Sequence, residues 1–194
     1  MRMSREAMAR HRKDIVASAS RMMRERGIAA TSVADLMQGA SLTHGGFYRH
    51  FESKEALAAE AVAKAYEDHL KSLETNASKN GPVAAAQTYA AEYLTQRHAE
   101  RPGFGCPMAA LGPDGAREGK GVREAFTEGT QAVIDKLAAG QSGSPAERRS
   151  KAIRLLATLV GAIVMSRAVG DEALGDEILA TCREKLSPPA QRSR

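Results

Sequence analysis

Apolar residues recur every three or four positions along most of this chain, the spacing that places them on one face of an α-helix. The first such stretch runs from Arg10 to Glu25, with Ile15 and Met22 on its inner face, and Gly27 provides the helix stop. Runs of alternating apolar and polar residues rich in Val, Ile and Thr are scarce. The pattern therefore predicts an all-α protein.

Capping residues mark the starts of two further helices. Ser32 and Asp35 have the spacing of a capping box, which predicts a short helix that ends near Gly39. Ser53 is a natural N-cap for a longer, Ala-rich helix that runs to about Asn76. Both starts depend on a side-chain oxygen that accepts a hydrogen bond from a backbone N–H with no partner inside the helix.

Residues 43–50 lie between these two helices and are predicted to form another short helix, here called the 43–50 segment. Thr43 is its expected N-cap. Phe47 and Phe51 stand four positions apart, so both are expected to point inward and to belong to the core, as is Leu36 of the preceding helix. Two short helices joined by a tight turn and supported by a third make a helix-turn-helix, a unit that places its second helix in the major groove of DNA.

The rest of the chain is predicted to be helical with two interruptions. Residues 80–82 read Asn-Gly-Pro and break the long helix, and residues 112–115 read Gly-Pro-Asp-Gly and predict a loop. The helices expected after the first break cover residues 83–98, 106–111, 122–137, 145–168 and 171–186.

The positive charge is concentrated at one end of the chain. Residues 1–54 hold ten Lys and Arg against five Asp and Glu, whereas the remaining residues balance, and the whole chain of 194 residues carries a formal charge of +5. A basic segment beside a neutral body is the electrostatic pattern of a nucleic-acid-binding protein. A solvated basic surface gives the same count, so charge alone leaves both interpretations open.

Several other classes of protein are disfavoured. The longest apolar run, residues 155–165, falls short of a bilayer span, and the charged start of the chain does not resemble a signal peptide, so we expect a cytoplasmic protein that is not associated with a membrane. Cys106 and Cys182 lack the spacing of a metal or disulfide site. We expect no cofactor, no metal and no catalytic site, because no catalytic motif with the required spacing is found.

The sequence from Thr31 to Leu57 closely resembles the DNA-binding unit of the TetR (tetracycline-repressor) family of bacterial transcriptional regulators. The likeness rests on Phe-Tyr-Arg-His-Phe at residues 47–51, followed by Ser-Lys-Glu-x-Leu at residues 53–57. The resemblance implies an all-helical homodimer with a DNA-binding domain at residues 8–68 and a ligand-binding and dimerisation domain at residues 69–187. Residues 188–194 are expected to be a disordered tail. Ser41 departs from the family pattern, which often has Gly in this turn.

The same resemblance assigns the DNA contacts. Tyr48 and Lys54 match positions that contact phosphate, and His44 projects toward the base edges. Gly45 and Gly46 weaken a helix but let its backbone approach the duplex closely. The expected DNA-binding residues are Thr31, Thr43, His44, Gly45, Gly46, Tyr48, Arg49, His50 and Lys54. Since one such helix reads few base pairs, a two-fold dimer on a palindromic operator is the expected arrangement.

The signal that releases the DNA is harder to identify. Phe104 and Met108 are candidates for an apolar ligand pocket, although such residues are more often plain core. Cys106 precedes Pro107 at a predicted helix start, where the helix dipole favours a thiolate, and is a candidate sensor of oxidants or electrophiles. An inert buried thiol is the alternative. The rival functions are a helical thiol enzyme and a ligand-binding protein that does not read DNA, and the sequence identifies neither operator nor inducer.

Overall fold

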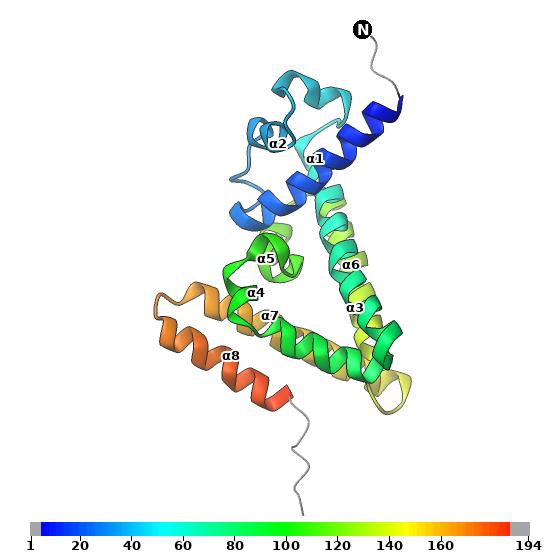
Figure 1. Ribbon diagram of the computed structural model, residues 1–194, viewed down its shortest axis with the longest axis vertical. Coiled ribbons are helices and arrows are strands. Elements are labelled where there is room, and N and C mark those ends of the chain that lie inside the picture. Colours follow the sequence, from blue (N-terminus) through cyan, green and yellow to red (C-terminus); the bar gives the residue numbers. More distant parts are fainter. Residues whose placement is uncertain (1–4, 187–194) are drawn as a thin grey trace, which may run out of the picture. The chain divides into compact units, whose positions relative to one another are not determined.

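Every regular element of the computed structural model, which describes residues 5–186, is a helix (Figure 1). The predicted all-α class is thus confirmed for this part of the chain, and the predicted tail at 188–194 lies outside it. The elements are α1 (Arg5–Arg26), α2 (Val33–Gly39), η1 (His44–Arg49), α3 (Lys54–Tyr93), α4 (Gln96–Glu100), η2 (Pro102–Phe104), α5 (Pro107–Gly115), α6 (Lys120–Ala139), α7 (Pro145–Ala168) and α8 (Glu172–Leu186).

The chain divides into two units, and α3 and α6 each contribute to both. The first unit holds the residues up to Asp68 together with Pro102–Gly129, and the second holds His69–Arg101 and the residues from Thr130 onward. Residues 102–129, which the sequence analysis placed in the second domain, therefore pack with the N-terminal helices. The functional boundary between residues 68 and 69 stays a prediction.

The core of the first unit forms around the inner face of α1. Ile15, Ala19 and Met23 are fully buried, as is Leu36 of α2. Ser32 caps α2 as expected, since its hydroxyl accepts a hydrogen bond from the Asp35 N–H at 3.1 Å and the Asp35 carboxylate accepts one from the Ser32 N–H at 3.0 Å. Burial and capping together stabilise a helix of only seven residues.

The turn after α2 has the geometry of a Schellman motif. The Ser41 N–H donates to the Gln38 carbonyl at 2.9 Å, and the Leu42 N–H donates to the Met37 carbonyl at 2.8 Å. Ser41 has φ +58°, in the left-handed region that favours glycine. Ser41 therefore adopts the left-handed backbone conformation that glycine usually takes in this turn, and this conformation lowers the stability of the fold.

Two predictions about local structure are wrong. The 43–50 segment forms the predicted short helix, as a 3₁₀-helix at His44–Arg49, but the Thr43 side chain does not cap it. Two adjacent glycines weaken the α-helical preference, which favours the tighter turn. Residues 112–115 belong to α5 and form no loop, because the Ala116 N–H still reaches the Gly112 carbonyl at 3.2 Å.

The long helix α3 contains the predicted break. Gly81 has φ +81° and ψ 163°, a conformation outside the helical region, and Pro82 follows it without an N–H to donate. In the first unit α3 packs closely on α6, where the ring of Tyr66 meets the ring of Phe126 edge-on with centroids 6.0 Å apart. A side chain at Gly129 would overlap the Tyr66 ring, so the close approach requires glycine.

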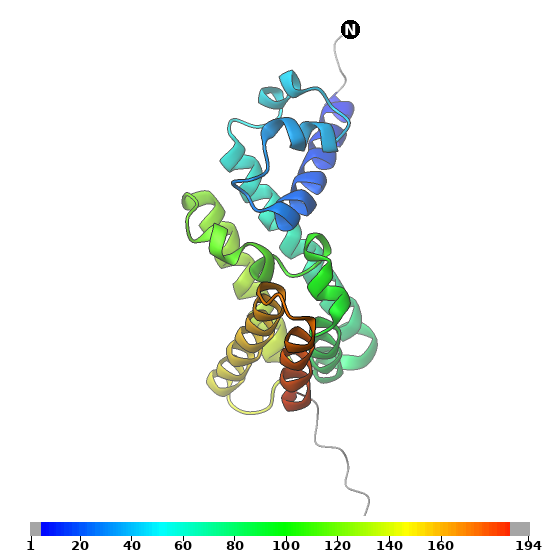
Figure 2. The same ribbon diagram turned by 90° about the vertical axis from the view of Figure 1, so that its left-hand side faces the viewer.

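The second unit contains α7 and α8, which run side by side in opposite directions (Figure 2). Ala152, Leu159 and Ile163 of α7 are buried. Arg167 near the end of α7 donates hydrogen bonds to the carbonyls of Ala99 at 2.9 Å and His98 at 2.7 Å, at the end of α4. No helix between residues 5 and 186 is long and apolar enough to cross a bilayer.

The left-handed conformation of Ser41 gives a stability prediction. Ser41→Gly should raise the free energy of unfolding by about 0.5 kcal/mol, because relief of the left-handed strain exceeds the entropy that glycine adds to the unfolded chain. Thermal unfolding should show a midpoint about 1–2 °C higher. Ser41→Val should shift the midpoint downward, since a β-branched side chain tolerates this region worst. Equal midpoints for all three proteins would contradict a strained turn.

Candidate nucleic-acid interface

The 43–50 segment has one buried and one exposed side. Phe47 is fully buried and Phe51 nearly so, with their ring centroids 5.7 Å apart. Tyr48 is 73% exposed. Its ring stands edge-on to the Phe47 ring, with the two ring centroids 5.2 Å apart. The aromatic pair holds the segment from inside, and the tyrosine hydroxyl is presented to solvent.

Most of the predicted DNA-binding residues share that exposed side. Thr43, His44, Gly45 and Arg49 are all exposed and lie within the one short segment that also carries Tyr48. A Cβ added to Gly45 would have no atom within 4 Å, whereas one added to Gly46 would lie 3.4 Å from the Met37 methyl carbon. Gly45 thus faces open space, and Gly46 faces α2.

Two predicted residues occupy different positions from the rest. Thr31 is completely buried and its hydroxyl donates to the Gly27 carbonyl at 2.7 Å, so its side chain cannot reach DNA and this prediction is corrected. Lys54, at the start of α3, is half-buried and donates from Nζ to the Ala29 carbonyl at 3.2 Å. The lysine therefore ties α3 to the loop before α2.

His50 ends the segment in a half-buried position with its ring centroid 6.3 Å from that of His11. Burial lowers the pKa of His50 from its ordinary value of 6.5, and the neighbouring His11, Arg12 and Arg49 lower it further. The imidazole is therefore neutral at neutral pH. A neutral imidazole can both donate and accept a hydrogen bond.

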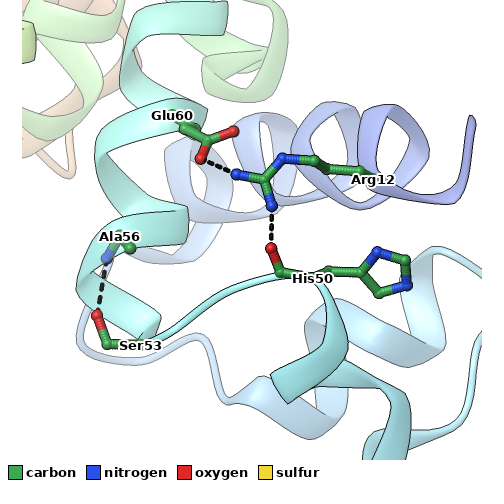
Figure 3. A network of polar contacts seen from close by, with 5 residues as sticks. All are labelled: Arg12, His50, Ser53, Ala56 and Glu60. Atoms are coloured by element: carbon green, nitrogen blue, oxygen red, sulfur yellow. Dashed lines mark hydrogen bonds and ion pairs between the residues drawn. The ribbon is translucent and has the colours of Figure 1, made fainter. Parts of the chain in front are cut away.

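Arg12 is a structural residue of this site that the sequence analysis counted only as charge. Its guanidinium extends from α1, donates to the His50 carbonyl and pairs with the Glu60 carboxylate of α3 (Figure 3). The same group lies 4.2 Å from the centroid of the Phe51 ring. Beside it the Ser53 hydroxyl caps α3 by accepting from the Ala56 N–H at 3.0 Å.

These contacts connect the end of the 43–50 segment to both supporting helices. A planar guanidinium suits the role, because it can stack on a ring and donate several hydrogen bonds at once. Arg12 is 41% exposed, so solvent screens its ion pair and each contact is individually modest. One signal in the sequence pointed to Arg12: it stands one turn before the buried Ile15, on the inner side of α1.

The candidate sensing residues do not form one pocket. Cys106 is 1% exposed and Met108 is half-buried, but Phe104 is 73% exposed, so its placement in a ligand pocket or core is corrected. Cys106 stands at the N-cap position of α5, and no disulfide joins it to Cys182. Within the described residues no three His, Cys, Asp or Glu side chains gather into a metal site.

Buried Arg24 links α1 to the segment that carries Cys106. Its Nη1 donates to the Gly105 carbonyl at 2.7 Å and its Nε to the Ser20 carbonyl at 2.9 Å. Burial lowers the pKa of the guanidinium, and the nearby Asp68, Cys106 and Glu25 act in the opposite direction. The peptide bond beside Cys106 is thus hydrogen-bonded directly to the helix that supports the 43–50 segment.

Comparison with known proteins agrees with this arrangement. The sequence profile of bacterial regulatory proteins of the tetR family matches residues 15–61, which include the second half of α1, all of α2 and the 43–50 segment, and the start of α3. The HTH-type transcriptional repressor DhaR of Mycobacterium sp. (strain GP1) is 29% identical over 85 residues. That match spans 43% of this chain and 43% of DhaR. The chain is thus similar to regulators of the tetR family over residues 15–61.

Two solved structures share its fold over almost the whole length. The reduced form of E. coli NemR has a TM-score of 0.76 at 21% identity, and the match covers 93% of this chain and 99% of NemR. A TetR-family regulator from Cytophaga hutchinsonii has a TM-score of 0.76 at 21% identity, with 96% of each chain covered. At this level of identity the likeness concerns the fold.

The role of Arg12 can be tested by hydrogen exchange. Arg12→Ala should increase the exchange rates of the His50 and Phe51 amides about fivefold, because losing contacts worth about 1 kcal/mol favours local opening. Amides of α7 should be unaffected. Arg10→Ala, which removes an exposed arginine from the same helix, is the matched control. If the His50 and Phe51 amides exchanged at the same rate in Arg12→Ala and Arg10→Ala, Arg12 would not stabilise the position of the 43–50 segment.

Proposed function

We propose that this protein is a TetR-family transcriptional repressor that binds a near-palindromic DNA operator as a homodimer. In this proposal the 43–50 segment enters the major groove, and such a repressor works on DNA in the cytoplasm. The observation that carries the proposal is the two-sidedness of that segment. Phe47 anchors it, while His44, Tyr48 and Arg49 face solvent together.

The chemistry of the exposed side suits a DNA backbone and base edges. A tyrosine hydroxyl and an arginine are common phosphate ligands, and an imidazole can hydrogen-bond a base edge. The open space at Gly45 allows a phosphate or sugar to approach the backbone. The net positive charge of residues 1–54 would attract the duplex, and binding should weaken steeply with salt as counterions are released.

Dimerisation is supported by an exposed apolar stripe on α7. Ile153 is 44% exposed and Val164 is 37% exposed, and the small residues Ala157 and Gly161 stand between them on the same side of the helix. Water-exposed apolar residues at this spacing suit packing against a second helix. A second copy of α7 is the partner that the resemblance to TetR-family regulators implies.

Two substitutions separate phosphate contact from base readout. Tyr48→Phe should weaken binding to every operator variant by a similar factor of about 2–10, because it removes one hydrogen bond to the backbone. His44→Ala should instead change the preference at one base pair in each half-site, where a lost base contact is worth about 1–3 kcal/mol. Binding to a set of operator variants that differ by single base pairs measures both effects.

The matched control for this experiment is Arg123→Ala, which removes an exposed cation on α6 outside the 43–50 segment. It should leave the order of preference among operator variants unchanged. If His44→Ala lowered binding to all operator variants by one common factor, His44 would be a backbone contact and the assignment of base readout would be wrong.

Release from DNA is proposed to follow a change at the segment that contains Cys106. The thiol is almost fully buried, so an adduct on it would displace the chain around Gly105 and break the hydrogen bond from Arg24. A quinone adds to the thiol without a leaving group: the new S–C bond forms and the thiol proton is retained by the product hydroquinone. Because Arg24 lies on α1, this displacement would disturb the support of the 43–50 segment.

Paired cysteine variants test this switch. Cys106→Ser should bind operator DNA as the unmodified protein does but should not release it when benzoquinone is added. Cys182→Ser, a variant at the half-buried cysteine of α8, should still release DNA. Fluorescence anisotropy of a labelled operator measures both. Release from Cys106→Ser equal to that from the unmodified protein would show that Cys106 is inert, without affecting the proposal of DNA binding.

A further inference from the structure

A cleft in the second unit lies between the second part of α3 and α7, and the turn after α6 closes one end of it. Its volume is about 380 Å³, within the range of small-molecule sites. Ala86 and Ala90 of α3 and Leu155 of α7 supply an apolar lining. Gln87, Arg154 and Thr158 supply polar groups from the same two helices.

The walls of this cleft are held in place by specific contacts. A Cβ at Gly140 would lie 2.5 Å from the Pro82 carbonyl oxygen and 2.8 Å from the Ala86 Cβ, so the turn after α6 packs directly on α3. Lys151 of α7 donates from Nζ to the Ser142 carbonyl at 2.8 Å and fastens the same turn to α7. The cleft is therefore a preformed feature of the second unit.

The charged residues that line the cleft are all basic. Lys151 and Arg154 both contribute to the cleft, and none of its lining residues is acidic. Glu147 lies one turn before Lys151, but its carboxylate accepts hydrogen bonds from the Ser144 N–H and hydroxyl at the start of α7. Arg154 uses Nη1 to donate to the Ser150 hydroxyl at 2.7 Å, and a guanidinium has five N–H donors in all.

We propose that this cleft binds a small organic anion that has a carboxylate and a short apolar body. The carboxylate pairs with Arg154, and the apolar body covers Ala86, Ala90 and Leu155. The cleft residues 151, 154, 155 and 158 of α7 lie beside the exposed stripe of Ile153 and Val164 on the helix surface. The proposal is independent of DNA binding and is tested without DNA.

Three simple probes test the two parts of the proposed ligand. Hexanoate carries both the charge and the apolar body, hexan-1-ol lacks the charge, and acetate lacks most of the apolar body. Hexanoate should bind with a dissociation constant of about a millimolar, as expected for a ligand this small, and the other two should bind at least several-fold more weakly. Calorimetric titration gives the affinities, and NMR shifts of the Gln87 and Gln141 side-chain amides locate the site.

A matched pair of arginine variants of the full chain tests the charged group. Arg154→Gln should weaken hexanoate binding about tenfold, because it removes a charge-assisted hydrogen bond. Arg149→Gln removes another exposed arginine of α7, one that bonds Asp135 and Gln131 outside the cleft, and should bind hexanoate as the unmodified protein does. Both side chains are exposed, so both variants should keep the fold, which the amide spectrum of α7 and α8 checks.

Each other outcome overturns the proposal. Equal binding of hexan-1-ol and hexanoate would show an apolar site without anion recognition. Equal binding of acetate and hexanoate would show general anion binding to surface cations. Unchanged hexanoate binding by Arg154→Gln, or amide shifts that avoid Gln87 and Gln141, would place the ligand elsewhere.

Discussion

The structure of the proposed DNA-binding surface depends on anchoring a helical turn that is too short to be stable alone. The 3₁₀-helix of the 43–50 segment has six residues and includes Gly45 and Gly46. Neither its length nor its composition favours a helix in water. Its position is therefore set from outside, by burial of Phe47 and Phe51 and by the contacts of Arg12 with the segment's last residue and with α3.

External anchoring explains how a distant chemical change can affect the surface. The helix that carries Arg12 also carries Arg24, which bonds the carbonyl of Gly105 next to Cys106. Residues 102–129 belong to the same unit as α1, so the segment with the thiol contacts the support of the DNA-binding surface without an intervening domain. In this account a displacement near Cys106 changes the position of α1. The 43–50 segment then moves as well, because Arg12 connects it to α1.

The sequence predicted those features that depend on local rules. The all-α class, the capping box at Ser32 and the break at Gly81 follow from spacing and from single residue types. Composition misled the prediction at residues 112–115, which continue a helix despite their turn-like residues, and Thr31 is buried with its hydroxyl bonded to Gly27. Arg12 acquires its role only when α3 folds beside α1, so long-range packing decides it. Partners that are distant in sequence leave no periodic signal.

Selection of bound sequences from random duplex DNA, with purified and fully reduced protein at low salt, tests the central claim most directly. The account predicts enrichment of a near-palindromic sequence whose two half-sites are one or more helical turns apart, because two copies of the 43–50 segment read it. The enrichment should persist for Arg123→Ala and change its base preference for His44→Ala. Failure to enrich any sequence under these conditions would contradict the claim that this segment reads DNA.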